Sequence, residues 1–132
     1  TFRPLSANDL ARGKLHAETY SLSQDTVDIV EATRARGGRV IAVGTTSTRV
    51  LESCVDAQGR LRAGDGQTEL FMRPGQPFRV VDGLLTNFHL PRSSLLLLVA
   101  AFMGTEPTLA AYRDAVAKGY RFYSYGDAML IL

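Results

Sequence analysis

The chain has 132 residues, 45% of them hydrophobic and 21% charged, which is the balance of one soluble globular domain rather than of a disordered segment. Its net charge of +2 is below that of dedicated nucleic-acid binders, although 13 of its 15 basic residues are arginine, which pairs well with phosphate and carboxylate. The longest apolar run, Leu95 to Met103, is too short for a membrane span, and no secretory segment opens the chain. We therefore expect a cytoplasmic protein without a membrane partner.

Metal and disulfide chemistry have little support in this composition. A single cysteine cannot form an internal disulfide, and two histidines are too few to indicate a metal site. We expect no structural metal.

The first predicted element is a strand from Lys14 to Leu22. Because side chains alternate between the two faces of a strand, His16 and Glu18 should point in the same direction, with Tyr20 beside them.

A helix and a second strand follow. The helix should run from Gln24 to Arg36, capped by Ser23 and ended by Gly37-Gly38, with an apolar stripe formed by Val27, Ile29 and Val30. The β-branched run Arg39 to Val43 predicts a short strand that is buried on both faces, as in a parallel sheet.

A hydroxyl-rich segment, Gly44-Thr45-Thr46-Ser47-Thr48, separates that strand from a helix predicted over Arg49 to Val55. Such a loop favours an anion or a nucleotide, because free N–H groups and the helix dipole attract negative charge. It is neither a Walker A motif nor a GxGxxG. The alternative is an ordinary capped turn with Thr46 or Ser47 as the N-cap.

The middle of the chain predicts a mobile surface loop and then a hairpin. Asp56 to Gln67 contains three glycines, and Thr68 to Met72 and Phe78 to Val81 should be the two strands of the hairpin. Pro91 and a Ser93 cap start a helix from Ser94 to Met103 that is apolar on all sides, belongs in the core and ends at Gly104.

A last helix and a last strand close the pattern. The helix should run from Thr105 to Gly119, with an apolar side formed by Leu109, Tyr112, Ala115 and Val116. Tyr120 to Tyr125 should be a strand, with Arg121, Tyr123 and Tyr125 on the face that could stack a base or hold a cationic sulfonium. The alternation of strands and helices predicts one α/β domain over residues 1–132, a three-layer unit with helices on both faces of a mostly parallel sheet.

The segment Gly83 to Ser94 indicates a site. It places Thr86, Asn87, His89 and Arg92 directly before the apolar run Leu95 to Met103. Polar groups at the edge of a core are costly unless they are paired or used.

Gly83 to Phe102 also resembles the signature segment of the S-adenosylmethionine:tRNA ribosyltransferase-isomerases of queuosine biosynthesis. Four further segments resemble this family in the same order: His16 to Tyr20, Gly44 to Ser53, Leu70 to Gly75 and Tyr120 to Ile131. Members of the family are considerably longer, so the resemblance implies the C-terminal part of such an enzyme, with a sheet that is incomplete without the N-terminal part. We expect such a piece to be inactive by itself and to self-associate through an exposed sheet edge.

The resemblance implies transfer and isomerisation of the ribosyl part of S-adenosylmethionine onto an aminomethyl-deazaguanine at the wobble position of tRNA, which gives epoxyqueuosine. S-adenosylmethionine is then a co-substrate rather than a cofactor, and adenine and methionine are released. Its partners would be tRNA and S-adenosylmethionine. Such a site needs a base for the proton on the ribose carbon next to sulfur, an acid, and a seat for the sulfonium.

Imidazole has the pKa nearest neutrality, so the histidines are the first catalytic candidates. His89 ranks first because it lies in the signature segment, and His16 ranks second, with Glu18 to orient it. Asp82 is the fourth candidate, as an acceptor for sugar hydroxyls or the substrate amine. The alternatives are hydrogen-bonded structural histidines and, for Asp82, turn chemistry.

The other candidates are expected to bind substrates. Those assigned to S-adenosylmethionine or the nucleoside are Thr45, Thr46, Ser47, Arg49, Thr86, Asn87, Phe88, Tyr123 and Asp127. Arg73 and Arg92 are expected to contact tRNA phosphates.

Two other classes of protein stay open. A non-catalytic tRNA-binding module would bind tRNA with a steep salt dependence and would ignore S-adenosylmethionine. An unrelated small-molecule α/β enzyme would use Gly44 to Arg49 for a different ligand. Binding measured separately with S-adenosylmethionine and with tRNA discriminates among the three.

Overall fold

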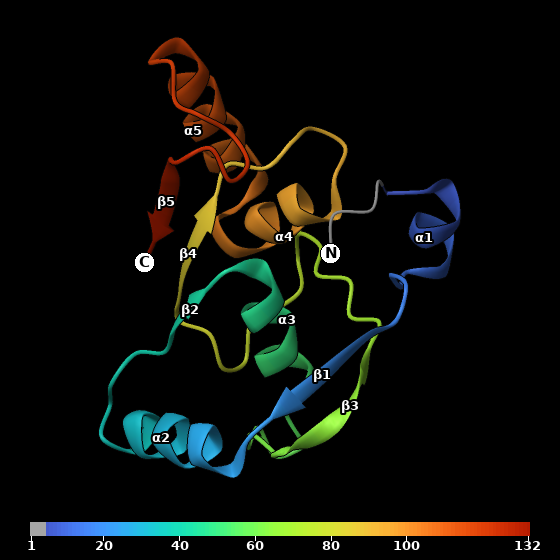
Figure 1. The fold of residues 1–132 in the computed structure, drawn as a ribbon, viewed down its shortest axis with the longest axis vertical. Helices are drawn as coiled ribbons and strands as arrows, with labels where there is room; N and C mark the ends of the chain where they lie inside the picture. Colours follow the sequence, from blue (N-terminus) through green and yellow to red (C-terminus); the bar gives the residue numbers. More distant parts are fainter. Residues whose placement is uncertain (1–4) are drawn as a thin grey trace.

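Two small sheets organise residues 5–132, which are the residues that the computed structural model describes (Figure 1). In the first sheet, β1 (Glu18–Leu22) pairs antiparallel with β3 (Gly64–Thr68). In the second, β4 (Gly83–Asn87) lies between β2 (Ile41–Val43), to which it is parallel, and β5 (Ala128–Ile131), to which it is antiparallel. The α/β class is confirmed, but the prediction of one mostly parallel sheet was wrong.

The helices begin and end largely where local capping signals predict. They are α1 (Ala7–Arg12), α2 (Gln24–Ala35), α3 (Thr45–Ser53), α4 (Ser94–Met103) and α5 (Thr105–Ala117). The hydroxyls of Ser23 and Ser93 accept backbone N–H groups in the first turns of α2 and α4, as expected. The helix α1 was not predicted, although Ser6 and Asp9 form a capping box at its start.

Gly104 ends α4 and also starts α5, with φ 92°. Among residues 5–132, no single helix is long and apolar enough to cross a membrane. Helices α4 and α5 together reach that length and apolar composition, but the chain bends by 115° between them.

Buried side chains form two clusters that pack against the three-stranded sheet. Leu98 and Val99 of α4 pack against Leu84 of β4. Val27 of α2 and Leu51 of α3 belong to a second buried cluster, together with Ala42 of β2 and residues outside the sheet. The helices therefore cover the face that Ala42 and Leu84 share.

The opposite face of this sheet is exposed. The parallel and antiparallel registers place Val43, Leu85 and Leu130 side by side on it, and Val43 and Leu130 are 66% and 57% exposed. Two predictions were wrong here: the sheet has helices on one face rather than both, and β2 is not buried on both faces. Strands β2 and β5 are the edges of the sheet, with no further strand beside them in the described part of the chain.

Three irregular segments were also mispredicted. The predicted loop Asp56 to Gln67 contains most of β3, while Phe78 to Val81 is not a strand and so the hairpin is absent. Tyr120 to Tyr125 is a series of turns, and the last strand comes later, as β5. On the helices, Ile29, Leu109 and Val116 are exposed instead of belonging to the predicted apolar stripes.

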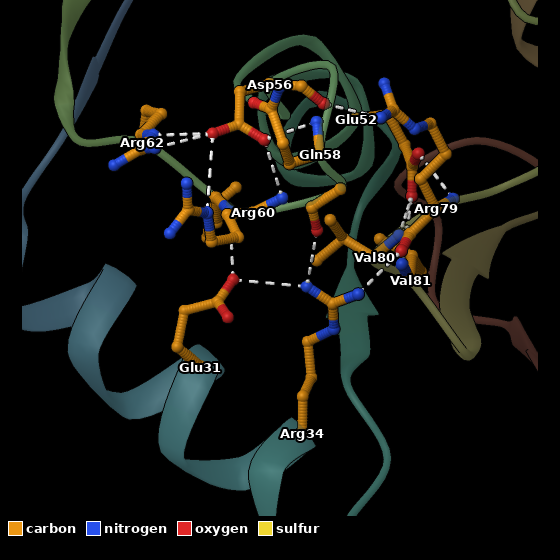
Figure 2. Close-up of polar contacts among 12 residues, drawn as sticks. Glu31, Arg34, Glu52, Asp56, Gln58, Arg60, Arg62, Arg79, Val80 and Val81 are labelled. Carbon is orange, nitrogen blue, oxygen red and sulfur yellow. Dashed lines mark hydrogen bonds and ion pairs between the residues drawn. The ribbon is translucent and has the colours of Figure 1, made fainter.

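The buried carboxylate of Glu52, on α3, holds the segment that leads into β4 (Figure 2). It accepts backbone N–H groups from Arg79, Val80 and Val81 at 2.8, 3.0 and 2.9 Å. Nearby, Arg34 of α2 donates to the carbonyl oxygen of Arg79 at 3.1 Å. Side chains thus satisfy backbone groups of this segment that, in the predicted hairpin, would have bonded a neighbouring strand.

Asp56 organises the turn after α3 in a similar way (Figure 2). Its carboxylate accepts the backbone N–H groups of Gln58 and Arg60, both at 2.9 Å, and pairs with the guanidinium of Arg62. The bond from the Arg60 backbone is the largest cause that lowers the pKa of Asp56 below its ordinary value.

We predict that Glu52→Ala lowers the free energy of unfolding by about 3 kcal/mol, because it leaves buried N–H donors without an acceptor. Glu52→Gln should cost less, since one acceptor oxygen remains. Urea unfolding of the purified chain measures both. The control is Asp28→Ala, which removes an exposed carboxylate on α2 that, among residues 5–132, bonds only Gln24 of the same helix. Equal losses in the Glu52 and Asp28 variants would contradict this role of Glu52.

Candidate active site

A pocket of about 230 Å³ opens where three segments of the chain meet. The first turn of α3 forms one wall, the end of β4 and the residues after it form the second, and a turn near the C-terminus forms the third. The lining residues are Gly44, Thr45, Thr46, Thr86, Asn87, His89, Tyr123 and Ser124.

The first wall follows from the conformation of Gly44. Its φ of 87° is one that side-chain-bearing residues rarely adopt, and its N–H donates to the carbonyl oxygen of Leu85 at 2.8 Å. The helix α3 starts directly after it, at Thr45, so the predicted loop over residues 44–48 is in fact the first helical turn. Neither Thr46 nor Ser47 is the N-cap, and no side chain caps this helix. Its first N–H groups are consequently left for other acceptors.

His89 is the buried titratable group of the pocket, with 5% of its surface exposed. Its Nε2 hydrogen-bonds the hydroxyl of Thr86 at 2.8 Å, and its backbone N–H donates to the hydroxyl of Tyr112 at 2.8 Å. Burial lowers the pKa of His89 to about 4. The imidazole is therefore neutral near pH 7 and can accept a proton or a hydrogen bond.

The third wall is a turn with an unusual backbone. Tyr123 has φ 58°, and its N–H donates to the carbonyl oxygen of Phe88 at 2.9 Å. The carboxylate of Asp127 accepts the backbone N–H of Arg121 and contacts its guanidinium, and the backbone bond is the largest cause that lowers the pKa of Asp127. Asn87 reaches the carbonyl oxygen of Asp127 at 3.4 Å. Asp127 thus positions the turn instead of lining the pocket.

Phe88 does not line this pocket. Its ring packs in an aromatic cluster with Tyr112, Tyr120 and Phe122, at centroid distances of 5.5, 5.5 and 5.4 Å. The structure gives it a packing role that anchors the turn near the C-terminus.

A second polar cluster joins β1 to α3. The predicted strand Lys14 to Leu22 begins only at Glu18, so His16 lies before it and the two residues do not share a strand face. The Nε2 of His16 nevertheless lies 3.3 Å from the carboxylate of Glu18. The other oxygen of Glu18 pairs with Arg49, which is only 3% exposed and also donates from Nε to the carbonyl oxygen of Leu70 at 3.0 Å. None of these three candidates lines the pocket.

The remaining candidates lie elsewhere. Asp82 precedes β4, at the end of the strand opposite to Thr86 and Asn87, and its carboxylate accepts the N–H of Val40 at 2.8 Å. Ser47 is exposed in the first turn of α3 and is not a lining residue. Arg73 and Arg92 are exposed, and Arg73 stacks over the ring of Phe71 at 5.4 Å.

The pocket therefore collects six of the sequence candidates: Thr45, Thr46, Thr86, Asn87, His89 and Tyr123. Sequence reasoning missed Gly44 and Ser124, although both lie inside the segments it singled out. Gly44 could have been recognised from its position between a predicted strand and the segment that starts a helix. In the described part of the chain, no group of three or more His, Cys, Asp or Glu side chains is arranged to hold a metal ion.

Comparison with known proteins covers nearly the whole chain. The family model for queuosine biosynthesis protein matches residues 1–131. The S-adenosylmethionine:tRNA ribosyltransferase-isomerase of Pelotomaculum thermopropionicum is 56% identical over 132 residues, which are 100% of this chain and 39% of the relative. The enzyme of the same name from Acidithiobacillus ferrooxidans is 60% identical over 131 residues, which are 99% of this chain and 38% of the relative.

A solved structure agrees with these sequence matches. The crystal structure of S-adenosylmethionine tRNA ribosyltransferase from Thermotoga maritima superimposes with a TM-score of 0.81 at 50% identity, and the match covers 86% of this chain and 40% of that one. The chain spans about two fifths of the length of the curated relatives it matches.

We predict that the ring signals of His89 titrate in NMR spectra with a midpoint near 4, because burial disfavours the charged imidazole. The unfolded imidazole keeps its ordinary pKa of 6.5, so the unfolded state binds a proton more readily between pH 6.5 and 4. The stabilising contribution of neutral His89 is therefore complete above pH 6.5 and is lost as the pH falls towards 4.

His89→Gln identifies these signals by their loss, and it should remove this part of the pH dependence of urea unfolding. A midpoint near 6.5 for His89 would contradict the prediction.

Proposed function

Since the chain belongs to the queuosine biosynthesis protein family, the S-adenosylmethionine:tRNA ribosyltransferase-isomerases, we propose that its pocket is part of the active site of such an enzyme. The proposed reaction transfers and isomerises the ribosyl part of S-adenosylmethionine onto an aminomethyl-deazaguanine at the wobble position of tRNA. The observation that carries this proposal is the convergence of Thr45, Thr46, His89 and Tyr123, from three distant segments, on one pocket.

His89 is the proposed proton acceptor. Its imidazole is buried and neutral, and the hydrogen bond between its Nε2 and the hydroxyl of Thr86 fixes the position of its ring. A neutral imidazole in a pocket with no charged lining side chain can take a proton from a carbon that a neighbouring sulfonium makes acidic. His89 is thus better placed for this role than His16, which precedes β1 and does not line the pocket.

The pocket holds only part of the co-substrate. A volume of about 230 Å³ is below the range of about 300 to 1,000 Å³ that is usual for sites enclosing a whole drug-sized ligand. We therefore propose that the rest of the site comes from the remaining three fifths of the relatives' length. On this view the 132-residue chain alone releases no adenine.

The other candidates take supporting roles in this proposal. His16, Glu18 and Arg49 position α3, because the buried Arg49 ties that helix to β1 through Glu18 and to Leu70. Arg73 and Arg92 are proposed phosphate contacts for tRNA, since both are exposed and neither forms an ion pair within residues 5–132.

The test uses a chimera in which residues 1–132 replace the matching segment of the full-length Acidithiobacillus ferrooxidans relative. His89→Ala should lower turnover by about 100-fold, the size of a lost general base. Turnover is measured as adenine released from S-adenosylmethionine in the presence of precursor tRNA. His16→Ala should retain most of the turnover, because it acts only through Glu18.

Thermal unfolding and tRNA affinity of the His89 variant serve as controls for folding. A turnover within about threefold of the unsubstituted chimera would remove His89 from the reaction. A chimera that binds tRNA but neither binds nor cleaves S-adenosylmethionine would favour the non-catalytic tRNA-binding module.

A further inference from the structure

The wall of the pocket formed by α3 is a helix N-terminus that no side chain caps. No hydrogen bonds within α3 are available to the N–H groups of Thr45, Thr46 and Ser47, and the cap, Gly44, has no side chain to accept them. The first turn of α3 also contains no acidic residue. The aligned peptide dipoles therefore place about half a positive charge at this point.

A second, independent observation concerns the buried side chain of Thr45. Thr45 is only 6% exposed and lines the pocket, and its hydroxyl has no hydrogen-bond partner within residues 5–132. The hydroxyl is therefore available to bond a ligand that occupies the pocket.

The absence of charged side chains in the lining indicates which anions the pocket can bind. The pocket has no charged side chain, and Arg49, the cation nearest to it along α3, is paired with Glu18. A helix N-terminus can bind either phosphate or carboxylate. Without an arginine or lysine in the lining, however, the pocket balances the single charge of a carboxylate better than the larger charge of a phosphate. A volume of about 230 Å³ suits a group the size of one amino acid.

We propose that this pocket binds the α-carboxylate of an amino-acid group, through the N–H groups of the first turn of α3 and the hydroxyl of Thr45. In the proposed reaction this group is the methionine end of S-adenosylmethionine, an assignment that rests on the proposed function. The binding of a small carboxylate by itself does not depend on that function.

The chain contains a matched control for the helix start. The segments Gly44 to Thr48 and Gly104 to Thr108 both begin a helix with glycine at nearly the same angles, φ 87° and 92°, followed by threonine. In both, the threonine four residues later donates its hydroxyl to the carbonyl oxygen of the glycine. Thr105, however, is exposed and does not line this pocket. Thr105→Val therefore controls for Thr45→Val.

The experiment titrates the isotope-labelled 132-residue chain with small probes and follows backbone amide signals by NMR. L-Methionine should shift the signals of Thr45, Thr46 and Ser47. L-Methioninol, which lacks only the carboxylate, should bind at least about tenfold more weakly, as expected for a lost charge-assisted hydrogen bond. Inorganic phosphate should not compete with methionine. Thr45→Val should weaken methionine binding about fivefold or more for the same reason, and Thr105→Val should leave it unchanged.

Equal binding of methionine and methioninol, preferential binding of phosphate, or the absence of any shift at α3 would each overturn the proposal. The probe comparison is made on the unsubstituted chain, so it decides the matter even where Thr45→Val fails to fold. If methionine binds but the chimera shows no turnover that depends on His89, the carboxylate site stands and the proposed function is contradicted. If the chimera turns over but methionine does not bind, the proposed function stands and the carboxylate site is contradicted.

Discussion

The backbone of Gly44 is the constraint on which the pocket depends. Its N–H bond to Leu85 joins the end of β2 to β4, and its positive φ turns the chain directly into α3. Nothing lies within 4 Å of the position that a Cβ would occupy, so backbone strain rather than crowding selects glycine. Because the turn takes no extra residues, the first N–H groups of α3 open beside the residues that follow β4.

The sequence predicted helix ends better than strands, for a physical reason. Ser23, Ser93 and Gly104 act on groups within their own turn, so their effect can be read locally. The strand β3, in contrast, contains Gly64, Asp65 and Gly66, which carry no apolar alternation, and it is a strand because β1 pairs with it.

The same limit explains which of the candidate site residues line the pocket. Thr45, Thr86 and His89 belong to segments whose composition already indicated a site, and the fold brought those segments together. Arg49 and Asp82 lie in equally suggestive surroundings, but their side chains bond Glu18 and the N–H of Val40. The partner of a polar side chain depends on contacts between distant segments, which one sequence does not reveal. Tyr120 to Tyr125 likewise alternates like a strand, yet Tyr123 adopts φ 58° to meet the carbonyl oxygen of Phe88.

The wall formed by Tyr123 and Ser124 also sets the order in which the site can appear during protein synthesis. Gly44 and the residues after β4 leave the ribosome well before this turn does, since chains grow from the N-terminus at about 5 to 20 residues per second. Until the turn has emerged and bonded to Phe88, the pocket lacks its third wall. A growing chain therefore exposes the first turn of α3 to water, and the pocket is complete only when these residues have been synthesised.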